Sequence, residues 1–246
     1  MVLMRCALIV SFLFAAAALG AERSPQWVIP LRDAVHEQRL TVGEIRSLYL
    51  EAISIAERSL SGAPLYRKLS RIEFFMGRAM EFEGFRREAR AHYEEGLRLA
   101  ERAVAISPCE DGWTLRAKNL AFLIPMRSMA FAVVNGMDVE RFAAQALALD
   151  PKKAPAQYLI AGRWLFAPRG FSNIPRGISM MEAILTDGDP DKSDRFNIYS
   201  AIGRGLVRQG KYTDAILWFD RALDIFPTNR VVREQLAVAE ANAVGL

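Results

Sequence analysis

The hydrophobic positions of the C-terminal third fall into two helical stripes separated by a turn. Both stripes repeat at intervals of three, four or seven residues, which is the spacing of one face of an α-helix. The first comprises Tyr199, Ile202, Gly203 and Leu206, and the second comprises Ala215, Phe219 and Ala222. Gly210 marks the turn, and Pro227 ends the second helix because its nitrogen carries no hydrogen. We therefore predict a helix-turn-helix unit from Phe196 to about Arg230.

Two earlier segments repeat parts of this pattern. One carries Tyr158, Ala161, Gly162 and Leu165, followed by a proline-bounded connection and a return helix over residues 176–185, with Met180 and Ala183 expected to face inward. The other has Gly77 in its first helix and Gly84 at the turn, and its second helix continues to Pro108. That second helix is about two turns longer than its C-terminal counterpart, and two turns are ~7.2 residues, so its apolar stripe stays on one face.

A weaker unit is predicted between these two, and single helices flank the whole array. Its first helix would run over residues 115–135 with a kink at Pro125, and its second over residues 139–149. Residues 42–60 and 231–244 are predicted to form flanking amphipathic helices. The predicted organisation is thus N-terminal capping helices over 21–69, a repeat region over 70–230 and a C-terminal capping helix over 231–246.

The order and spacing of these large, small and proline positions resemble the tetratricopeptide-repeat (TPR) family. The resemblance implies an all-α solenoid of about four TPR-like helix pairs, with a concave groove lined by the first helix of each pair. The lengthened helix ending at Pro108 and the insertion before Met180 are also similar to the TPR component of periplasmic TRAP transporters (TatT-like), over about residues 70–190. That narrower resemblance implies a periplasmic solute-binding protein as partner and an apolar ligand.

The N-terminus has the layout of a secretory signal peptide. Arg5 precedes a 14-residue apolar run from Cys6 to Leu19, and the small pair Gly20-Ala21 follows. We predict that residues 1–20 are removed by cleavage after Gly20 and that the protein is periplasmic or otherwise exported. The alternative is an uncleaved anchor, although the run is short of the ~20 residues that span a bilayer. Cys6 precedes the run, which disfavours a lipid anchor, and no later segment predicts a membrane span.

Composition and short motifs argue against several classes of function. The 32 basic and 28 acidic residues are spread along the chain, without the clustering typical of nucleic-acid binding. The sequence contains no zinc-ligand spacing, phosphate-binding loop or nucleophile elbow, so we predict no catalytic, cofactor or metal residues and no enzymatic activity. His36 and His92 are expected to face solvent. Cys109, the single cysteine left after cleavage, is expected to lie in a loop without a role.

Three arginines are the first candidate binding residues. Arg78, Arg163 and Arg204 each follow a glycine at the same position of its unit, so all three are predicted to face the concave groove. The planar guanidinium group suits carboxylate or phosphate ligands. Asn197 is added because TPR proteins that bind a peptide's terminal carboxylate use an Asn/Lys/Arg set, although the full set is not present here. The alternative is that these are ordinary surface arginines.

Aromatic side chains beside these arginines are the second candidate feature. Phe74 and Phe82 flank the first arginine, and Trp164 and Phe166 flank the second. They are expected to make an apolar groove with cations at intervals, and the alternative is that they belong to the core.

The sequence therefore predicts an exported scaffold that binds a protein or peptide in its concave groove, and it leaves homo-oligomerisation open. The alternative function is a TRAP-transporter accessory that handles a small hydrophobic or carboxylated ligand with a periplasmic solute-binding protein. A closed apolar pocket near Trp164 and Phe166 would favour that alternative, whereas an open groove would favour a peptide.

Overall fold

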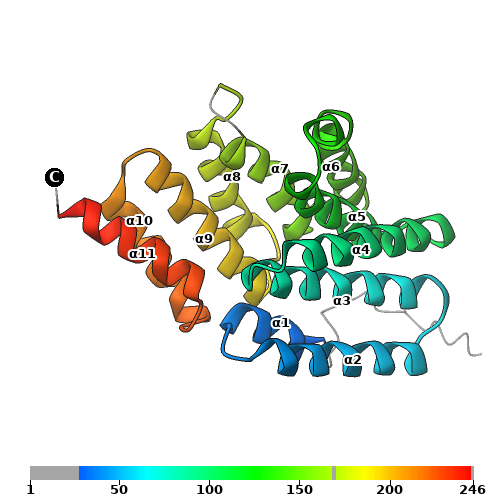
Figure 1. The fold of residues 1–246 in the computed structure, drawn as a ribbon. Helices are drawn as coiled ribbons and strands as arrows, with labels where there is room; N and C mark the ends of the chain where they lie inside the picture. Colours follow the sequence, from blue (N-terminus) through cyan, green and yellow to red (C-terminus); the bar gives the residue numbers. More distant parts are fainter. Residues whose placement is uncertain (1–27, 168–169, 245–246) are drawn as a thin grey trace, which may run out of the picture.

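The computed structural model describes residues 28–167 and 170–244, and this part of the chain is all-α (Figure 1). It contains eleven α-helices, one 3-10 helix and no β-strand within those ranges. The helices are α1 (Ile29–Glu37), α2 (Val42–Ser59), α3 (Gly62–Phe82), α4 (Arg86–Ile106), α5 (Glu110–Leu123), α6 (Met129–Leu149), α7 (Ala154–Phe166), α8 (Ile174–Asp187), α9 (Lys192–Arg208), α10 (Tyr212–Ile225) and α11 (Arg230–Ala243). The predicted fold class is confirmed.

Consecutive helices pack as four pairs, α3/α4, α5/α6, α7/α8 and α9/α10. The first helices of the pairs contact one another in succession along the inner side of the stack, while α2 packs on α3 and α11 packs on α10. We refer to α3, α5, α7 and α9 as the inner helices. This arrangement is the helical solenoid that the repeated pattern predicts.

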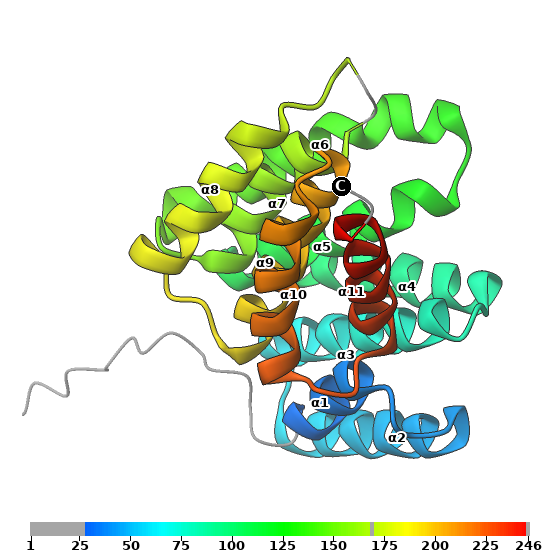
Figure 2. The ribbon, with the colours of Figure 1, turned by 90° about the vertical axis from the view of Figure 1, so that its left-hand side faces the viewer.

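The inner helices are closed into a ring by α1, a feature that the sequence did not predict. α1 contacts both α3 and α9, so α1, α3, α5, α7 and α9 touch in a complete circuit. Figure 1 shows α1 below α3 and beside the segment that joins α10 to α11, and Figure 2 shows the same region turned by 90°. Leu31 and Val35, 0% and 1% exposed, pack into the hydrophobic core shared with α2, α3 and α4, which holds α1 against α3. The concave surface is therefore enclosed at the point where an open superhelix would have its gap.

Close approach between paired helices depends on glycine, as predicted for the C-terminal pair. A Cβ atom added to Gly203 would lie 2.5 Å from the Phe219 ring, and one added to Gly77 would lie 2.7 Å from Tyr93. Gly162 is also buried, but its Cβ would meet only Phe166 of its own helix, at 3.5 Å. In that pair the close approach is made from α8 instead, at a glycine that the sequence analysis did not consider.

That glycine, Gly177, explains an error in the predicted inner face of α8. A Cβ on Gly177 would lie 3.0 Å from the backbone nitrogen of Leu165, so this face of α8 packs against α7. Met181 and Ile184 share the face and are 0% and 3% exposed. The predicted inward residue Ala183 is exposed, because the true face is offset by one position.

The segment around Pro125 also departs from the prediction. A continuous kinked helix was expected, but α5 ends at Leu123 and a 3-10 helix spans Ile124–Met126. Proline removes a backbone donor and clashes with the preceding turn, and Ser128 then caps a new helix by accepting a hydrogen bond from the Phe131 backbone N–H at 3.3 Å. α6 is consequently one 21-residue helix, Met129–Leu149.

The boundaries of α3 and α4 and the N-terminal segment are compared with their predictions next. α4 extends over 21 residues to Ile106, which confirms the lengthened second helix. α3 begins at Gly62, so the boundary predicted at residue 70 falls inside a helix. The predicted signal peptide, residues 1–20, lies outside the described residues. Within the described residues, none of the helices combines the length and hydropathy needed to cross a bilayer.

Candidate functional site

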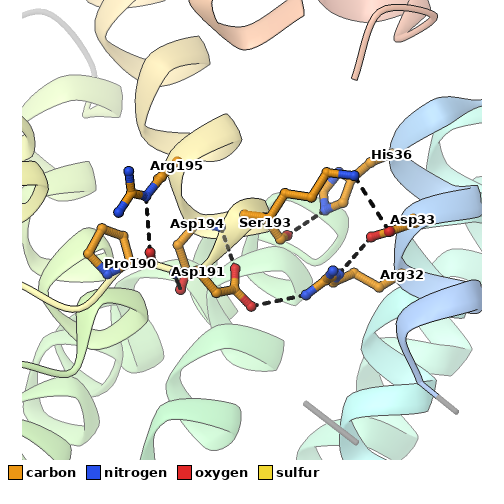
Figure 3. Close-up of polar contacts among 9 residues, drawn as sticks. Arg32, Asp33, His36, Pro190, Asp191, Ser193, Asp194 and Arg195 are labelled. Atoms are coloured by element: carbon orange, nitrogen blue, oxygen red, sulfur yellow. Dashed lines mark hydrogen bonds and ion pairs between the residues drawn. The ribbon is translucent and has the colours of Figure 1, made fainter. Parts of the chain in front are cut away.

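Polar side chains of α1 and of the start of α9 form the contact that closes the ring (Figure 3). His36 Nε2 and Ser193 Oγ are 2.7 Å apart, and Arg32 Nη1 donates a hydrogen bond to Asp191 Oδ2 at 3.1 Å. These pairs join residues separated by 157 and 159 positions in the chain. The closure is therefore a specific polar contact between the two ends of the repeat array.

His36 lies at the centre of this contact and is 5% exposed, so the predicted solvent-facing histidine is wrong. Its ring stacks on Phe226 at a centroid distance of 4.9 Å and also meets Phe196 at 5.1 Å. Burial, reinforced by the positive charges of Arg78 and Lys118, lowers the pKa of His36 well below its ordinary value. The imidazole is consequently neutral at physiological pH and packs inside the contact that closes the circle of inner helices.

The connection between α10 and α11 seals the other side of α1. Thr228 Oγ1 donates to the Glu37 carbonyl at 2.8 Å, and Asn229 Nδ2 donates to the His36 carbonyl at 2.7 Å. These donors satisfy carbonyl groups that the C-terminus of a helix leaves unpaired. The end of α1 is thus held by the last helix pair as well as by α9.

A cavity of about 440 Å³ lies inside the ring, at the end where α5, α7 and α9 begin. Its volume falls within the ~300–1,000 Å³ typical of small-ligand sites. Part of the wall is apolar and part is charged. The apolar wall comprises Ile29, Phe74, Phe75 and Leu115, and the charged wall comprises Arg32, Arg71, Asp111, Lys118, Asp150, Lys152, Lys153, Asp189, Asp191 and Asp194.

Asp111 is the most strongly paired acid of this wall. Its side chain forms ion pairs with Arg71 and with Lys153, whose Nζ is 2.7 Å from Asp111 Oδ1. Burial alone would raise the pKa of Asp111, but the charges of Arg71 and Lys153 outweigh it and hold the pKa well below its usual range. These groups form a fixed ionic support between α3, α5 and the start of α7.

Asp194 is an acid of a different kind. Asp191 and Asp194 cap α9 reciprocally, since each carboxylate accepts from the other residue's backbone N–H, at 2.8 and 3.2 Å. Burial, followed by the negative charge of Asp191, raises the pKa of Asp194 to about 6. No Lys or Arg nitrogen of the described residues lies within 4.0 Å of the Asp194 carboxylate.

Lys118 of α5 is a cation of the cavity wall that, like Asp194, has no partner of opposite charge among the described residues. Its Nζ lies 4.5 Å from the centroid of the Phe74 ring, and no carboxylate of the described residues lies within 4.0 Å of it. Burial lowers the pKa of Lys118, an effect that the charge of Asp194 opposes. Sequence analysis did not select Lys118, although it lies three residues after Leu115, which lines the same cavity.

The three predicted arginines have different surroundings in the structure. Burial raises the pKa of Tyr158, and the charges of Arg204 and Arg78 both oppose that rise. Arg78 donates to Glu81 Oε2 at 2.7 Å, whereas Arg204 is exposed. Arg163 is directed elsewhere and pairs with a glutamate of α6, the outer helix of the preceding pair.

The predicted aromatic residues divide between core and surface. Phe74 is 4% exposed and belongs to the core as well as to the cavity wall. Phe82 is half-buried under the Arg78 guanidinium at 4.3 Å, and Phe166 is 39% exposed beneath the Arg204 guanidinium at 4.7 Å. Trp164 is half-buried and covered by the guanidinium groups of two neighbouring arginines, at 5.2 and 4.1 Å. Asn197 is half-buried on α9.

Two further predictions about polar residues are corrected. His92 does not face solvent freely, because its Nδ1 lies 2.7 Å from Glu73 Oε2. Cys109 is the N-cap of α5, where its sulfur accepts from the Gly112 backbone N–H at 3.4 Å, so it has a structural role. Within residues 28–167 and 170–244, no group of three or more His, Cys, Asp or Glu side chains is arranged to hold a metal ion.

Comparison with known proteins identifies the architecture. No protein-family model and no curated protein matched the sequence. The structure is similar to the crystal structure of TTC0263, a thermophilic TPR protein from Thermus thermophilus, with a TM-score of 0.57 and 15% sequence identity. The match covers 87% of this chain and 99% of that chain. The fold is a TPR-like helical solenoid. At this identity the likeness shows the fold alone.

Proposed function

We propose that the protein is an exported, non-catalytic scaffold that binds a protein or peptide partner through the inner surface of its TPR-like solenoid. The observation that carries this proposal is the exposed pair of Arg204 and Phe166. The guanidinium group lies 4.7 Å from the ring centroid and forms no ion pair with the described residues. Arginine and aromatic side chains are enriched in the cores of protein interfaces, so this pair is suited to anchor a partner.

The partner segment is expected to carry carboxylates beside an apolar side chain. Arg78 and Phe82 repeat the same stacked arrangement on α3, at 4.3 Å. Guanidinium groups hold carboxylates through two parallel hydrogen bonds, while the rings beneath them offer apolar contact. An acidic segment with an aromatic or aliphatic residue therefore fits this end of the ring.

Export is part of the same proposal and rests on the N-terminal residues. The basic Arg5, the apolar run and the small pair Gly20-Ala21 support removal of a signal peptide. Fractionation of the producing cells, followed by mass spectrometry of the N-terminus, tests it. A cytoplasmic protein that retains residues 1–20 would refute export without affecting the binding proposal.

Two charge reversals at equivalent repeat positions test the binding surface. The partner is first captured by crosslinking in the exporting compartment and purified, and its Kd is then measured by calorimetry. Arg204→Glu is expected to weaken binding at least tenfold, or about 1.4 kcal/mol, because a repelling charge replaces the guanidinium. Arg163→Glu is the matched control and should change Kd by less than about threefold. Equal effects of the two variants would refute the assignment of this surface.

The cavity keeps the second candidate function open, a TRAP-transporter accessory working with a periplasmic solute-binding protein. A closed apolar pocket near Trp164 and Phe166 would favour this function, but arginines stack on both rings and Phe166 is 39% exposed. The cavity lies instead at the opposite ends of the inner helices and is lined by charges. Such a wall favours a polar ligand over a purely hydrophobic one. Specific crosslinking to a solute-binding protein would distinguish this function from a peptide-binding scaffold.

A further inference from the structure

The cavity inside the ring holds one cation and one acid that lack partners of opposite charge. Lys118 Nζ contacts only the Phe74 ring, at 4.5 Å, among the interactions that the described residues make with it. Asp194 accepts a backbone hydrogen bond at 3.2 Å through Oδ2, which leaves Oδ1 available. Both side chains line the same cavity, and they are too far apart to form an ion pair with each other.

Most other charges of the wall are paired or exposed. Asp111 pairs with Arg71 and Lys153, and Asp191 accepts from Arg32 at 3.1 Å. Lys152 and Asp189 also line the cavity, but both are exposed to solvent, which screens them. Lys118 and Asp194 are therefore left as one positive and one negative group that line the cavity.

The chemistry of a ligand follows from this pair of groups. A ligand that carries only a negative charge would be repelled by the acids capping α9, and a ligand that carries only a positive charge would be repelled by Lys118 and Arg71. An apolar ligand would remove water from both charges without replacing it, at a large energetic cost. A molecule with both a carboxylate and an ammonium group can pair with each charge while its side chain contacts the apolar wall.

We infer that the cavity binds a small zwitterion of the amino-acid class, with its carboxylate directed to Lys118 and its ammonium group to Asp194. The volume of about 440 Å³ accommodates a free amino acid or a dipeptide together with some water. This site is separate from the exposed pair of Arg204 and Phe166, because it lies where α5, α7 and α9 begin. The inference therefore does not depend on the proposed protein partner.

Thermal shift and calorimetry with the purified protein test this inference. The probes are the free amino acids and their simple dipeptides at up to about 10 mM and pH 7.5, where Asp194 is ionised because its pKa is about 6. At least one zwitterion is expected to raise Tm and to give a measurable Kd. Its deaminated acid and its decarboxylated amine, which each keep one charge, are expected to bind at least about tenfold more weakly.

Two variants then assign the contacts. Lys118→Met keeps the length and apolar stem of the side chain, and Asp194→Asn keeps an acceptor for the α9 cap. Each should weaken binding of the zwitterion at least about tenfold, while the control Lys152→Met should stay within about threefold. Failure of every zwitterion to bind, tight binding of the single-charge analogues, or wild-type affinity in both variants would each overturn the inference. Circular dichroism confirms that each variant is folded before its Kd is compared.

Discussion

Adding one methyl group to Gly203 should destabilise the protein, whereas the same addition to Gly162 should stabilise it. The two glycines occupy equivalent positions in neighbouring repeats, so the sequence pattern treats them alike. The structure does not, because a Cβ on Gly203 would lie 2.5 Å from the Phe219 ring and one on Gly162 would lie 3.5 Å from Phe166. The first distance requires a shift of a ring that is 0% exposed, and the second is an ordinary van der Waals contact.

The magnitudes follow from two opposing effects. Replacing a helical glycine by alanine gains about 0.5–1 kcal/mol through reduced backbone entropy of the unfolded chain. Forcing an additional methyl group into a close-packed contact costs about 1–3 kcal/mol. Gly203→Ala should therefore lose up to about 2.5 kcal/mol net, and Gly162→Ala should gain up to about 1 kcal/mol. In a chain of this size each kcal/mol corresponds to about 2–4 °C in Tm.

Urea unfolding followed by circular dichroism measures these differences directly. A change in the midpoint with an unchanged slope reports stability alone. Gly136→Ala supplies the baseline, because a Cβ there meets no other atom within 4 Å and the residue is exposed. If Gly162→Ala destabilises as much as Gly203→Ala, or if Gly203→Ala matches the baseline variant, the explanation of close packing at the C-terminal pair is refuted.

Three further changes test other parts of the structure. Ala222→Arg forces a charge into a helix contact that is 0% exposed and should cost several kcal/mol, seen as loss of cooperative unfolding. Asp194→Asn tests a pKa raised from 3.8 to about 6. The folded state binds the extra proton between these values, so stability falls as pH rises through about 6, and the variant should raise Tm at pH 7.5 more than at pH 4. Arg163→Glu faces Glu140 at the surface and should lower stability by less than about 1 kcal/mol in urea unfolding.

The helix pairs were predictable because two paired helices are close in the sequence and small side chains mark the positions where they approach. Gly203, Ala215 and Ala222 recur where helices approach, and Phe219 fills the space between them, so the spacing along the chain reports the contact itself. The prediction failed at Gly162 for the same reason. There the neighbouring helix supplies its own small residue, Gly177, and the close approach is made from that helix instead.

The ring closure could not be predicted in the same way, because no local period encodes it. The hydrogen bonds of His36 with Ser193 and of Thr228 with Glu37 join residues 157 and 191 positions apart. The available signal was the pair Leu31 and Val35, one helical turn apart, which indicates a buried face but not the surface that covers it. Long-range polar contacts depend on how the superhelix curves, which follows from all of the pairs together.

The candidate site was recovered only in part for a related reason. Arg78 pairs with Glu81 and Arg204 is exposed, each guanidinium over an aromatic ring, and the predicted groove lined by both stays a prediction. Register cannot indicate that Arg163 meets Glu140, because that partner belongs to α6, whose boundaries were predicted incorrectly. The neighbouring helix supplies the ionic partner of a surface arginine. The sequence can therefore place a charged residue on one face of its own helix, but it does not show which residue neutralises that charge.

Closure by α1 changes what a TPR-like solenoid can do with its inner surface. In an open superhelix one groove must serve both recognition of a partner and any enclosure of a small molecule. Here Arg32 helps to line the cavity, and His36 contacts α9 and so helps to close the circle of inner helices. The nine-residue helix α1 therefore contributes both to the cavity wall and to the closure. The exposed pair of Arg204 and Phe166 lies at the other end of the inner helices. The two ends can therefore present different chemistry, a cavity lined by charges and an exposed arginine-aromatic surface, without competing for the same side chains.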